Sequence, residues 1–237
     1  MNVGVIVFPG SNCDRDIAYV TRDLLQQPTR MIWHEDSDLG PVDLVVVPGG
    51  FSYGDYLRCG AIAQFSPALR ATVEHANRGG LVLGVCNGFQ ILTEAGLLPG
   101  ALVRNRNLHF ICDRLPLRIE RLDLPWTQVY STPADGSHKV ITLPIAHGEG
   151  CYYADDDTLK ALEDHNQVVF RYSAPDGTLG DRYNPNGSAH SIAGICNRQG
   201  TVLGMMPHPE RAADALLGST DGLGLFQGVL TALARAA

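Results

Sequence analysis

Residues 81–90 bring an apolar run, a sharp turn and a helical pattern together in ten positions. They read Leu81-Val82-Leu83-Gly84-Val85-Cys86-Asn87-Gly88-Phe89-Gln90. A strand that enters a helix through Gly-x-Cys-x-Gly is a nucleophile elbow in which cysteine takes the place of serine. Glycine is needed at both ends of this motif, because the residues two before and two after the nucleophile crowd together. The segment therefore predicts a buried strand, a strained nucleophile at Cys86 and a helix over 89–98.

Cys86 is expected at the N-terminus of that helix, where unpaired N–H groups and the helix dipole favour a thiolate. The alternative is a buried structural cysteine between two loop glycines, since cysteine is among the most buried residue types. The strand before Cys86 and the helix after it favour the nucleophile.

Strands and helices alternate through the rest of the first half. Val3–Phe8 is a β-branched run of the kind found in central strands of parallel sheets. We expect further strands at residues 31–33 and 44–47, and helices over residues 15–26, 57–65 and 68–77, with Asn12 or Asp14 as the first N-cap. This alternation predicts an α/β fold with a doubly wound, mostly parallel sheet flanked by helices. Ligands of such sheets bind at the carboxyl ends of the strands, where Pro9-Gly10, Gly49-Gly50 and Cys86 would lie.

The second half has the pattern of antiparallel strands separated by turns. Asn197–Gly200 is a hairpin turn between two of them, and Gly222–Ala234 has the apolar spacing of a core-facing helix. We expect these strands to extend the sheet and to form a small side sheet, within one domain over residues 1–237. Strands are expected at residues 110–122, 128–130, 140–146, 168–172, 192–196 and 201–206.

Composition narrows the class of protein. The 237 residues are 45% hydrophobic with a formal net charge of -7, and they contain no basic run, so nucleic acid is not an expected partner. The N-terminus has no signal-peptide pattern and no apolar run approaches the length of a membrane span. The six cysteines are scattered without a Cys-x-x-Cys pair, which argues against a zinc site and fits free thiols in a cytoplasmic protein.

A cysteine nucleophile needs a base and a group that orients the base. Among eight histidines, His208 stands between two prolines, and Glu210 follows two residues later. Prolines hold His208 extended, and residues two apart on an extended chain point to the same side, so Glu210 can reach the ring. The alternative is a solvated proline-rich turn. We favour the triad Cys86, His208 and Glu210, with His147 as the competing base.

The site also needs donors for an oxyanion. In an elbow, one donor is the backbone N–H of the residue after the nucleophile, here Asn87. Gly50 is the candidate for the second donor, because Gly49-Gly50 ends a neighbouring strand and carries no side chain that blocks approach. The alternative for this pair is an ordinary glycine-rich turn. A third cluster, residues 146–150, is either a turn between strands or a wall of the substrate site.

At these residues the sequence resembles the class I, triad-type glutamine amidotransferases. The resemblance rests on Pro48-Gly49-Gly50, Gly84–Gln90 and His208-Pro209-Glu210. Over nearly the whole chain it is similar to the family of glutaminase subunits of phosphoribosylformylglycinamidine synthase, through Pro9-Gly10-Ser11-Asn12-Cys13-Asp14, Gly49–Asp55, His147–Gly150, Asn184–Ser188 and Gly204–Arg211. The resemblance implies that Cys86, His208 and Glu210 are catalytic, and that Gln90 and the backbone around Gly148 bind glutamine.

The resemblance also implies a partnership. Ammonia from glutamine would pass to a large synthetase subunit that activates phosphoribosylformylglycinamide with ATP and magnesium, and the resemblance also implies a small accessory subunit in the complex. The chain has no Gly-x-x-x-x-Gly-Lys-[Ser/Thr] loop, so it is expected to hold no cofactor and no metal, and ATP belongs on the partner. Two other functions stay open: a free-standing cysteine hydrolase or peptidase, and a catalytically silent regulatory module.

Overall fold

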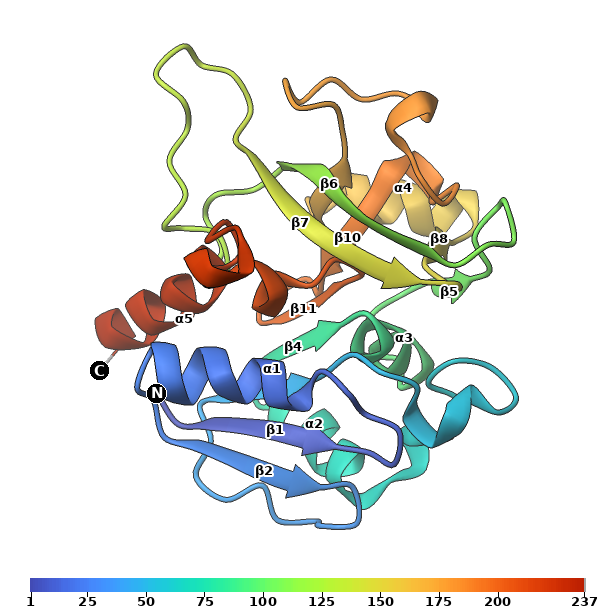
Figure 1. The fold of residues 1–237 in the computed structure, drawn as a ribbon. Coiled ribbons are helices and arrows are strands. Elements are labelled where there is room, and N and C mark those ends of the chain that lie inside the picture. Colours follow the sequence, from blue (N-terminus) through green and yellow to red (C-terminus); the bar gives the residue numbers. More distant parts are fainter. Residues whose placement is uncertain (237) are drawn as a thin grey trace.

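The fold is built on one nine-stranded sheet that runs through the whole molecule (Figure 1). The structure is a computed structural model, and it describes residues 1–236. Strand order is β2-β1-β3-β4-β11-β10-β9-β6-β7, and β5 pairs with β8 in a separate two-stranded sheet. The strands are β1 Val3–Val7, β2 Thr29–Trp33, β3 Leu44–Val47, β4 Leu81–Val85, β5 Ala101–Val103, β6 Ile111–Ile119, β7 Val140–His147, β8 Cys151–Tyr153, β9 Val168–Tyr172, β10 Ile192–Cys196 and β11 Val202–Met205. The α-helices are α1 Asp14–Ala18, α2 Pro67–Asn77, α3 Asn87–Glu94, α4 Asp156–Asp164 and α5 Leu223–Ala236.

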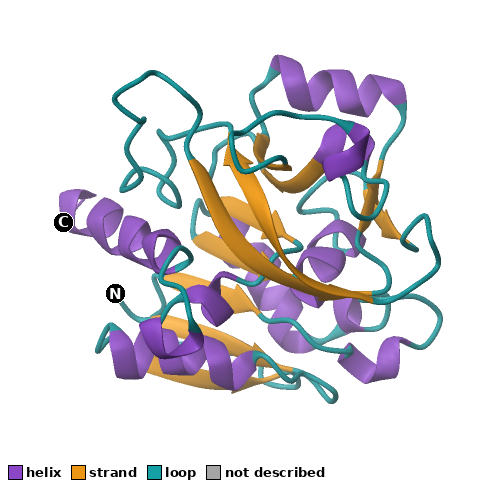
Figure 2. Ribbon diagram, turned by 45° about the horizontal axis from the view of Figure 1, so that its top comes forward, coloured by secondary structure: helices purple, strands orange, loops and turns teal. Residues whose placement is uncertain are grey.

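The first five strands of the sheet are parallel. β1 pairs with β2 and β3, and β4 pairs with β3 and β11, all in parallel register. Every residue of β3 and β4 is buried, as expected for strands covered on both faces. Helix α1 lies in front of this part of the sheet in Figure 1 and α2 lies behind it, so both faces are covered. Helices flank the strands in the rotated view as well (Figure 2).

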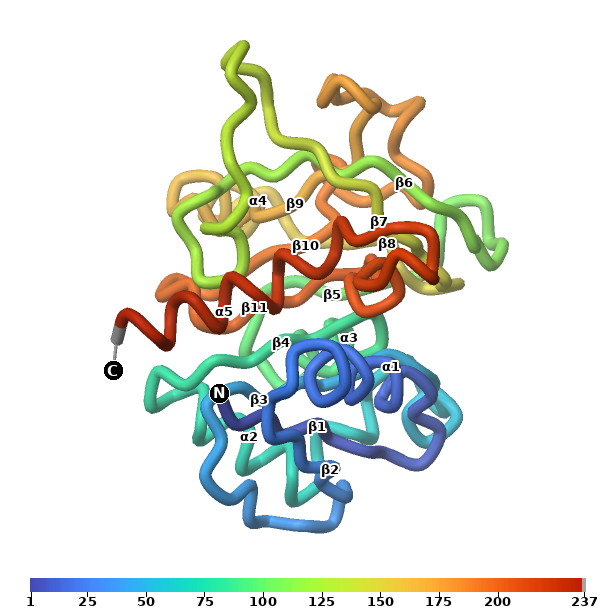
Figure 3. Tube along the Cα trace, turned by 60° about the vertical axis from the view of Figure 1, so that its left-hand side comes forward, coloured from blue at the N-terminus to red at the C-terminus, as the bar shows by residue number. Residues whose placement is uncertain are grey.

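A segment from late in the chain joins the two halves of the sheet. β11 lies between β4 and β10, and in Figure 3 β11 runs beside β4 although more than a hundred residues separate the two strands. From β10 onward the pairing is antiparallel, through β9 and β6 to β7. The predicted α/β fold, the added antiparallel strands and the small side sheet are therefore confirmed.

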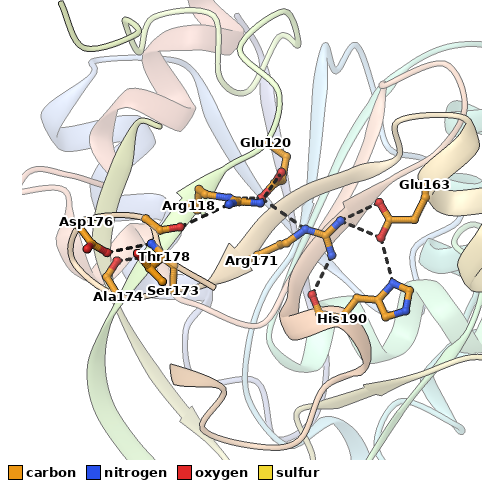
Figure 4. Close-up of polar contacts among 10 residues, drawn as sticks. Arg118, Glu120, Glu163, Arg171, Ser173, Ala174, Asp176, Thr178 and His190 are labelled. Atoms are coloured by element: carbon orange, nitrogen blue, oxygen red, sulfur yellow. Dashed lines mark hydrogen bonds and ion pairs between the residues drawn. The ribbon is translucent and has the colours of Figure 1, made fainter. Parts of the chain in front are cut away.

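A buried arginine fastens the antiparallel half. Arg171, on β9, is 7% exposed, and its Nη2 donates to both carboxylate oxygens of Glu163 on α4 at 2.7 and 2.8 Å. Its Nε lies 3.4 Å from Glu120 Oε1, and its Nη1 donates to the carbonyl of His190 (Figure 4). Arg118 completes the network by pairing with Glu120 at 2.6 Å. This network ties α4, β9, β6 and the segment before β10 together.

Several local predictions are wrong in part or in full. The expected helix over 15–26 is present as α1 continued by a π-helix, Tyr19–Leu24. Its predicted N-cap is wrong, because Cys13 occupies that position without a side-chain cap, so neither Asn12 nor Asp14 has that role. The expected helix over 57–65 is only a 3-10 turn at Ala63–Phe65, because the left-handed conformations of Leu57 and Gly60 interrupt it.

The expected strand at 128–130 is a turn. The N–H groups of Thr127 and Gln128 both donate to the carbonyl of Leu124, and the Tyr130 N–H donates back to Thr127. The apolar residues of this segment anchor it to the core instead, since the buried Trp126 donates its indole N–H to Gly200 at 2.9 Å.

Within residues 1–236, no helix combines the length and the apolar character needed to cross a membrane. Both ends of the described chain lie on the same side of the molecule in all three overall views (Figures 1–3).

Candidate active site

Cys86 occupies the tight turn between β4 and α3. It has φ 52° and ψ −107°, a conformation that L-residues avoid and that functional turns retain. The flanking glycines are required, as predicted: a Cβ on Gly88 would collide with the carbonyl of Val47, and a Cβ on Gly84 would lie 2.8 Å from the carbonyl of Gly88. The elbow holds Cys86 at the carboxyl end of the sheet and at the first turn of α3.

His208 and Glu210 follow β11, the strand parallel to β4. The ring Nδ1 of His208 lies 2.6 Å from Glu210 Oε1, and both side chains are almost completely buried. The predicted contact between Glu210 and the His208 ring is therefore present. The extended chain that was expected to produce it is not. Only His208 is extended, and Pro209–Ala212 forms a 3-10 turn that swings Glu210 back toward the ring.

The surroundings of His208 favour its charged form. Burial alone lowers the pKa of this imidazole, but the carboxylate of Glu210, the charge on Cys86 and contacts with the thiols of Cys13 and Cys86 hold the pKa well above its usual range. Because Nδ1 is bonded to Glu210, Nε2 is the ring atom left for the sulfurs, and among the described residues this buried nitrogen forms no hydrogen bond. The ring therefore lies between Glu210 and the cavity that the predicted nucleophile lines.

The two candidate oxyanion donors have free N–H groups. Among the described residues, neither the Gly50 nor the Asn87 amide donates a hydrogen bond to protein. Asn87 is the first residue of α3, so its N–H has no partner inside the helix. Gly50 adopts φ 145°, and a Cβ there would lie 2.8 Å from backbone atoms of Gly10 and Asn12. Both residues lie where the prediction places them, beside Cys86.

The side chain of Asn87 connects the nucleophile turn to the loop after Gly50. Its Oδ1 accepts from Ser52 N–H at 3.0 Å, and its Nδ2 donates to Asp55 at 3.1 Å and to Gln90 Oε1 at 2.9 Å. Gln90 Nε2 donates in turn to the carbonyl of Glu149 at 2.6 Å. Gln90, predicted to bind glutamine, lines the cavity and also joins α3 to the turn after β7.

His147, the competing base, is held as a neutral imidazole. Its Nδ1 lies 3.1 Å from Asn105 Oδ1, which also accepts from Gly150 N–H. Because that oxygen is an acceptor, Nδ1 carries the proton and Nε2 carries the lone pair. Burial, reinforced by the nearby His208, lowers the pKa of His147 to about 4. In the described structure no carboxylate hydrogen-bonds this ring, so the arrangement favours His208 as the base.

The site opens onto one cavity of about 340 Å³, near the lower end of the volume range for small-molecule sites. Cys86 and His208 lie on its wall together with Gly50, Gln90 and Gly148. Asp55 and Glu149 add negative charge to the lining. Burial raises the pKa of the Asp55 carboxyl, with hydrogen bonds from Cys59 and Asn87 opposing it. Arg211 lies on the same wall, so charges of both signs line the cavity.

Cys13, His208 and Glu210 bring sulfur, nitrogen and oxygen atoms within 4.8 Å of one another. These atom types also bind zinc. In this cluster, however, the short hydrogen bond between His208 and Glu210 uses two of the three groups, which fits a catalytic pair better than a metal centre.

Sequence reasoning missed two residues of the site, Cys13 and Asn105. Cys13 follows the turn after β1, so its place at the carboxyl edge of the sheet was a usable signal. Asn105 is completely buried and bonds to His147, His109 and Gly150, but a single asparagine between two strands gives no sequence pattern.

The family model and the sequence relatives that match this chain agree with one another. Residues 1–221 match the model of the CobB/CobQ-like glutamine amidotransferase domain. A protein from Acaryochloris marina, named phosphoribosylformylglycinamidine synthase subunit PurQ, is 68% identical over 233 residues, covering 98% of this chain and 97% of that protein. A protein of the same name from Synechocystis is 68% identical over 223 residues, 94% and 97% of the two chains.

Solved structures agree with the sequence relatives. A chain in the structure of PurLQS from Thermotoga maritima superposes with a TM-score of 0.84 at 40% identity, covering 98% of both chains. Another protein of Thermotoga maritima, described as a glutamine amidotransferase, superposes with a TM-score of 0.58 at 16% identity. That match covers 97% of this chain and 96% of the other, and it shows a shared fold.

Proposed function

We propose that this chain, which belongs to the family of CobB/CobQ-like glutamine amidotransferase domains, is the glutaminase subunit of phosphoribosylformylglycinamidine synthase in purine biosynthesis. It hydrolyses glutamine to glutamate and ammonia, and the ammonia converts phosphoribosylformylglycinamide to phosphoribosylformylglycinamidine on a partner synthetase. The observation that carries the proposal is that Cys86 and His208 line one cavity, with Glu210 bonded to His208, beside two backbone amides that donate to no other described residue.

The first half of the reaction forms a thioester. The Cys86 thiolate attacks the side-chain amide carbon of glutamine, and the N–H groups of Gly50 and Asn87 hold the tetrahedral oxyanion. His208, kept protonated by Glu210, donates its proton to the departing ammonia. Removing one oxyanion donor in such a site typically costs about 10²–10³ in turnover.

The second half releases glutamate. His208, now neutral, takes a proton from water that attacks the thioester, and the sulfur of Cys86 leaves. Glu210 fixes the ring tautomer through the 2.6 Å bond to Nδ1 and stabilises the imidazolium each time it forms.

Gln90 and the backbone around Gly148 hold the substrate in this proposal. Both line the cavity, and Gln90 is fixed at both ends of its amide by Asn87 and Glu149. A locked side chain and a rigid turn position a ligand at a smaller cost in conformational entropy than mobile groups would.

The partners are a large synthetase component and a small accessory component, as in the PurLQS assembly. ATP and magnesium bind on the synthetase, and this chain carries no cofactor of its own. Exposed apolar side chains beside the cavity, among them Phe51, Leu57 and Phe110, fit a surface that a partner covers. We place the complex in the cytoplasm, where the six free thiols of this chain would stay reduced. We treat residues 1–237 as a single glutaminase domain.

The test is glutamate production by the purified chain, alone and with its synthetase, the small accessory component, ATP and phosphoribosylformylglycinamide. The proposal predicts glutamate and phosphoribosylformylglycinamidine in equal amounts from the complex. A chain that cleaves glutamine or peptides equally well without the partners would instead be a free-standing hydrolase. A chain that cleaves nothing under either condition would be a regulatory module.

A further inference from the structure

The buried thiol of Cys13 lies against the catalytic machinery although the mechanism above gives it no role. Cys13 follows the turn after β1 and is 2% exposed. Its sulfur lies with a ring nitrogen of His208 and a carboxylate oxygen of Glu210 in a cluster no wider than 4.8 Å. The hydrogen bonds that Cys13 forms with its other neighbours therefore determine whether its sulfur can donate to His208 or accept from it.

Gly49 shows how closely the three reactive side chains converge. A Cβ built on this glycine would lie 2.9 Å from His208 Cε1, 3.0 Å from Cys13 Sγ and 3.4 Å from Cys86 Cβ. Only a bare backbone fits between them. The Gly49 carbonyl accepts from the N–H of Cys13 at 3.2 Å, so the loop that carries Gly50 is also fastened to the turn that carries Cys13.

Two hydrogen bonds fix the donor and acceptor roles of the Cys13 thiol. The thiol donates to Asn12 Oδ1 at 3.1 Å, and the sulfur accepts from Arg211 Nη2 at 3.1 Å. With its only proton used on Asn12, the sulfur can offer His208 only a lone pair. The buried Nε2 of that ring forms no hydrogen bond among the described residues, so it is free to use such an acceptor when it is protonated. Burial raises the pKa of Cys13, with contacts to His208 opposing it, so this acceptor is a neutral thiol.

We propose that Cys13 is a positioning residue for His208, a neutral sulfur that serves, together with Cys86, as an acceptor for the otherwise unpaired Nε2–H of the imidazolium. This inference rests on the proposed glutaminase function. A neutral acceptor stabilises the protonated ring without competing for its proton as a second carboxylate would. Its role matters most when the imidazolium forms again during hydrolysis of the thioester, because the sulfur of Cys86 is then bound to carbon and is no longer a thiolate partner for the ring.

Loss of this contact has two measurable effects. The ring of His208 loosens, and since a 1 Å misplacement of a catalytic group costs about 100-fold, a partial loosening should lower kcat by roughly 10-fold. Protonated His208 also loses an acceptor, so its pKa falls and the alkaline limb of the pH–rate profile moves to lower pH. KM should change less than about two-fold, because Cys13 acts on the proton-transfer step rather than on ground-state binding.

The experiment compares Cys13→Ala, Cys13→Ser and Cys196→Ala in the assembled complex, with glutamate release measured from pH 6 to pH 10. Cys196 is a matched control because it is equally buried but lies on β10 outside the cavity. We expect Cys13→Ala to lose kcat and to shift the alkaline limb, Cys13→Ser to recover much of both through its hydroxyl acceptor, and Cys196→Ala to keep the wild-type profile.

Two outcomes overturn the inference. An unmoved pH profile with unchanged kcat in Cys13→Ala would show that the sulfur does not act on His208. Equal losses in Cys13→Ala, Cys13→Ser and Cys196→Ala without a pH shift would show a packing effect only. Failure of the proposed function is distinguishable, because the wild-type complex would then release no glutamate at any pH. Titration of competent sites with a glutamine-mimicking electrophile corrects each kcat for unfolded protein.

Discussion

Asn87 Oδ1 accepts a hydrogen bond of 3.0 Å from the Ser52 N–H, which fixes the loop after Gly50 to the first turn of the nucleophile helix. The same side chain donates to Asp55 at the far end of this loop. Between those anchors the loop contains left-handed Tyr53 and Gly54. The contacts of Asn87 therefore connect the loop that follows one oxyanion donor to the helical turn that carries the other, so this loop is a candidate for control by the partner.

We predict that the isolated chain hydrolyses glutamine slowly and that the complex, with ATP and its substrate, is much faster. A displaced oxyanion donor weakens transition-state binding more than substrate binding, so the gain should be in kcat. Steady-state glutamate production before and after assembly measures it. Asn87→Ala should lower kcat in both states, whereas Asn107→Ala, an exposed asparagine, should not. An isolated chain already as fast as the complex would rule out this control.

His208→Ala should be more damaging than Glu210→Gln. His208 transfers protons, whereas Glu210 orients and charges the ring, so the first variant loses the step itself. Combining either with Cys86→Ala should add little further loss, because the three groups act as a unit. The measurement is kcat/KM for glutamine in the complex. If His147→Ala were as damaging as His208→Ala, the neutral His147 would have to be the base.

The positions of most elements could be predicted from the sequence, because their patterns are strong. β3, β9 and β10 have the predicted bounds, and the strand–turn–helix around Cys86 follows from its two glycines. Predictions failed where tertiary contacts decide. Glu210 reaches His208 through a 3-10 turn rather than an extended chain, and Cys13 joins the site only because β1 and β4 end at the same edge of the sheet.

A glutamine-mimicking electrophile should label Cys86 ahead of the other thiols. Burial raises the pKa of Cys59, and its contacts with Asp55 and Glu149 raise it further, so this cavity thiol stays protonated. Burial raises the pKa of Cys196 to about 11. Peptide mapping after brief treatment gives the answer, with Cys86→Ala as the control. Label found chiefly on Cys13 or Cys59 would contradict the assignment of the nucleophile.

Arg171→Leu should destabilise the fold without touching the cavity. The variant leaves Glu163 and Glu120 without their buried cation, a loss of about 2 kcal/mol after allowing for the partial exposure of Glu163. Urea unfolding measures it. Lys160→Met, which removes the exposed pair with Asp164, should cost less than about 0.5 kcal/mol. Equal losses of unfolding free energy in the two variants would show that the Arg171 network stabilises the fold no more than an exposed ion pair does.

The Arg171 network should also make the free energy of unfolding depend on pH in the acidic range. Burial opposes ionisation of Glu163, but Arg171 and His190 outweigh it and lower the pKa of this carboxyl below its ordinary value of 4.5. The folded state therefore binds this proton less readily than the unfolded chain does. Its contribution is present above the unfolded pKa and is lost as pH falls through the folded pKa. Unfolding free energies measured between pH 3 and pH 6 should fall more steeply for the wild type than for Glu163→Gln.

The most direct test is the Cys86→Ala complex supplied with either glutamine or ammonium chloride as nitrogen source. If Cys86 only releases ammonia, this variant should make no phosphoribosylformylglycinamidine from glutamine but should match the wild type when ammonium is supplied, because the synthetase site is intact. Product formed from glutamine by Cys86→Ala would contradict a Cys86 nucleophile. Product absent with ammonium as well, in a complex that still assembles, would contradict the division of labour between this chain and its partner.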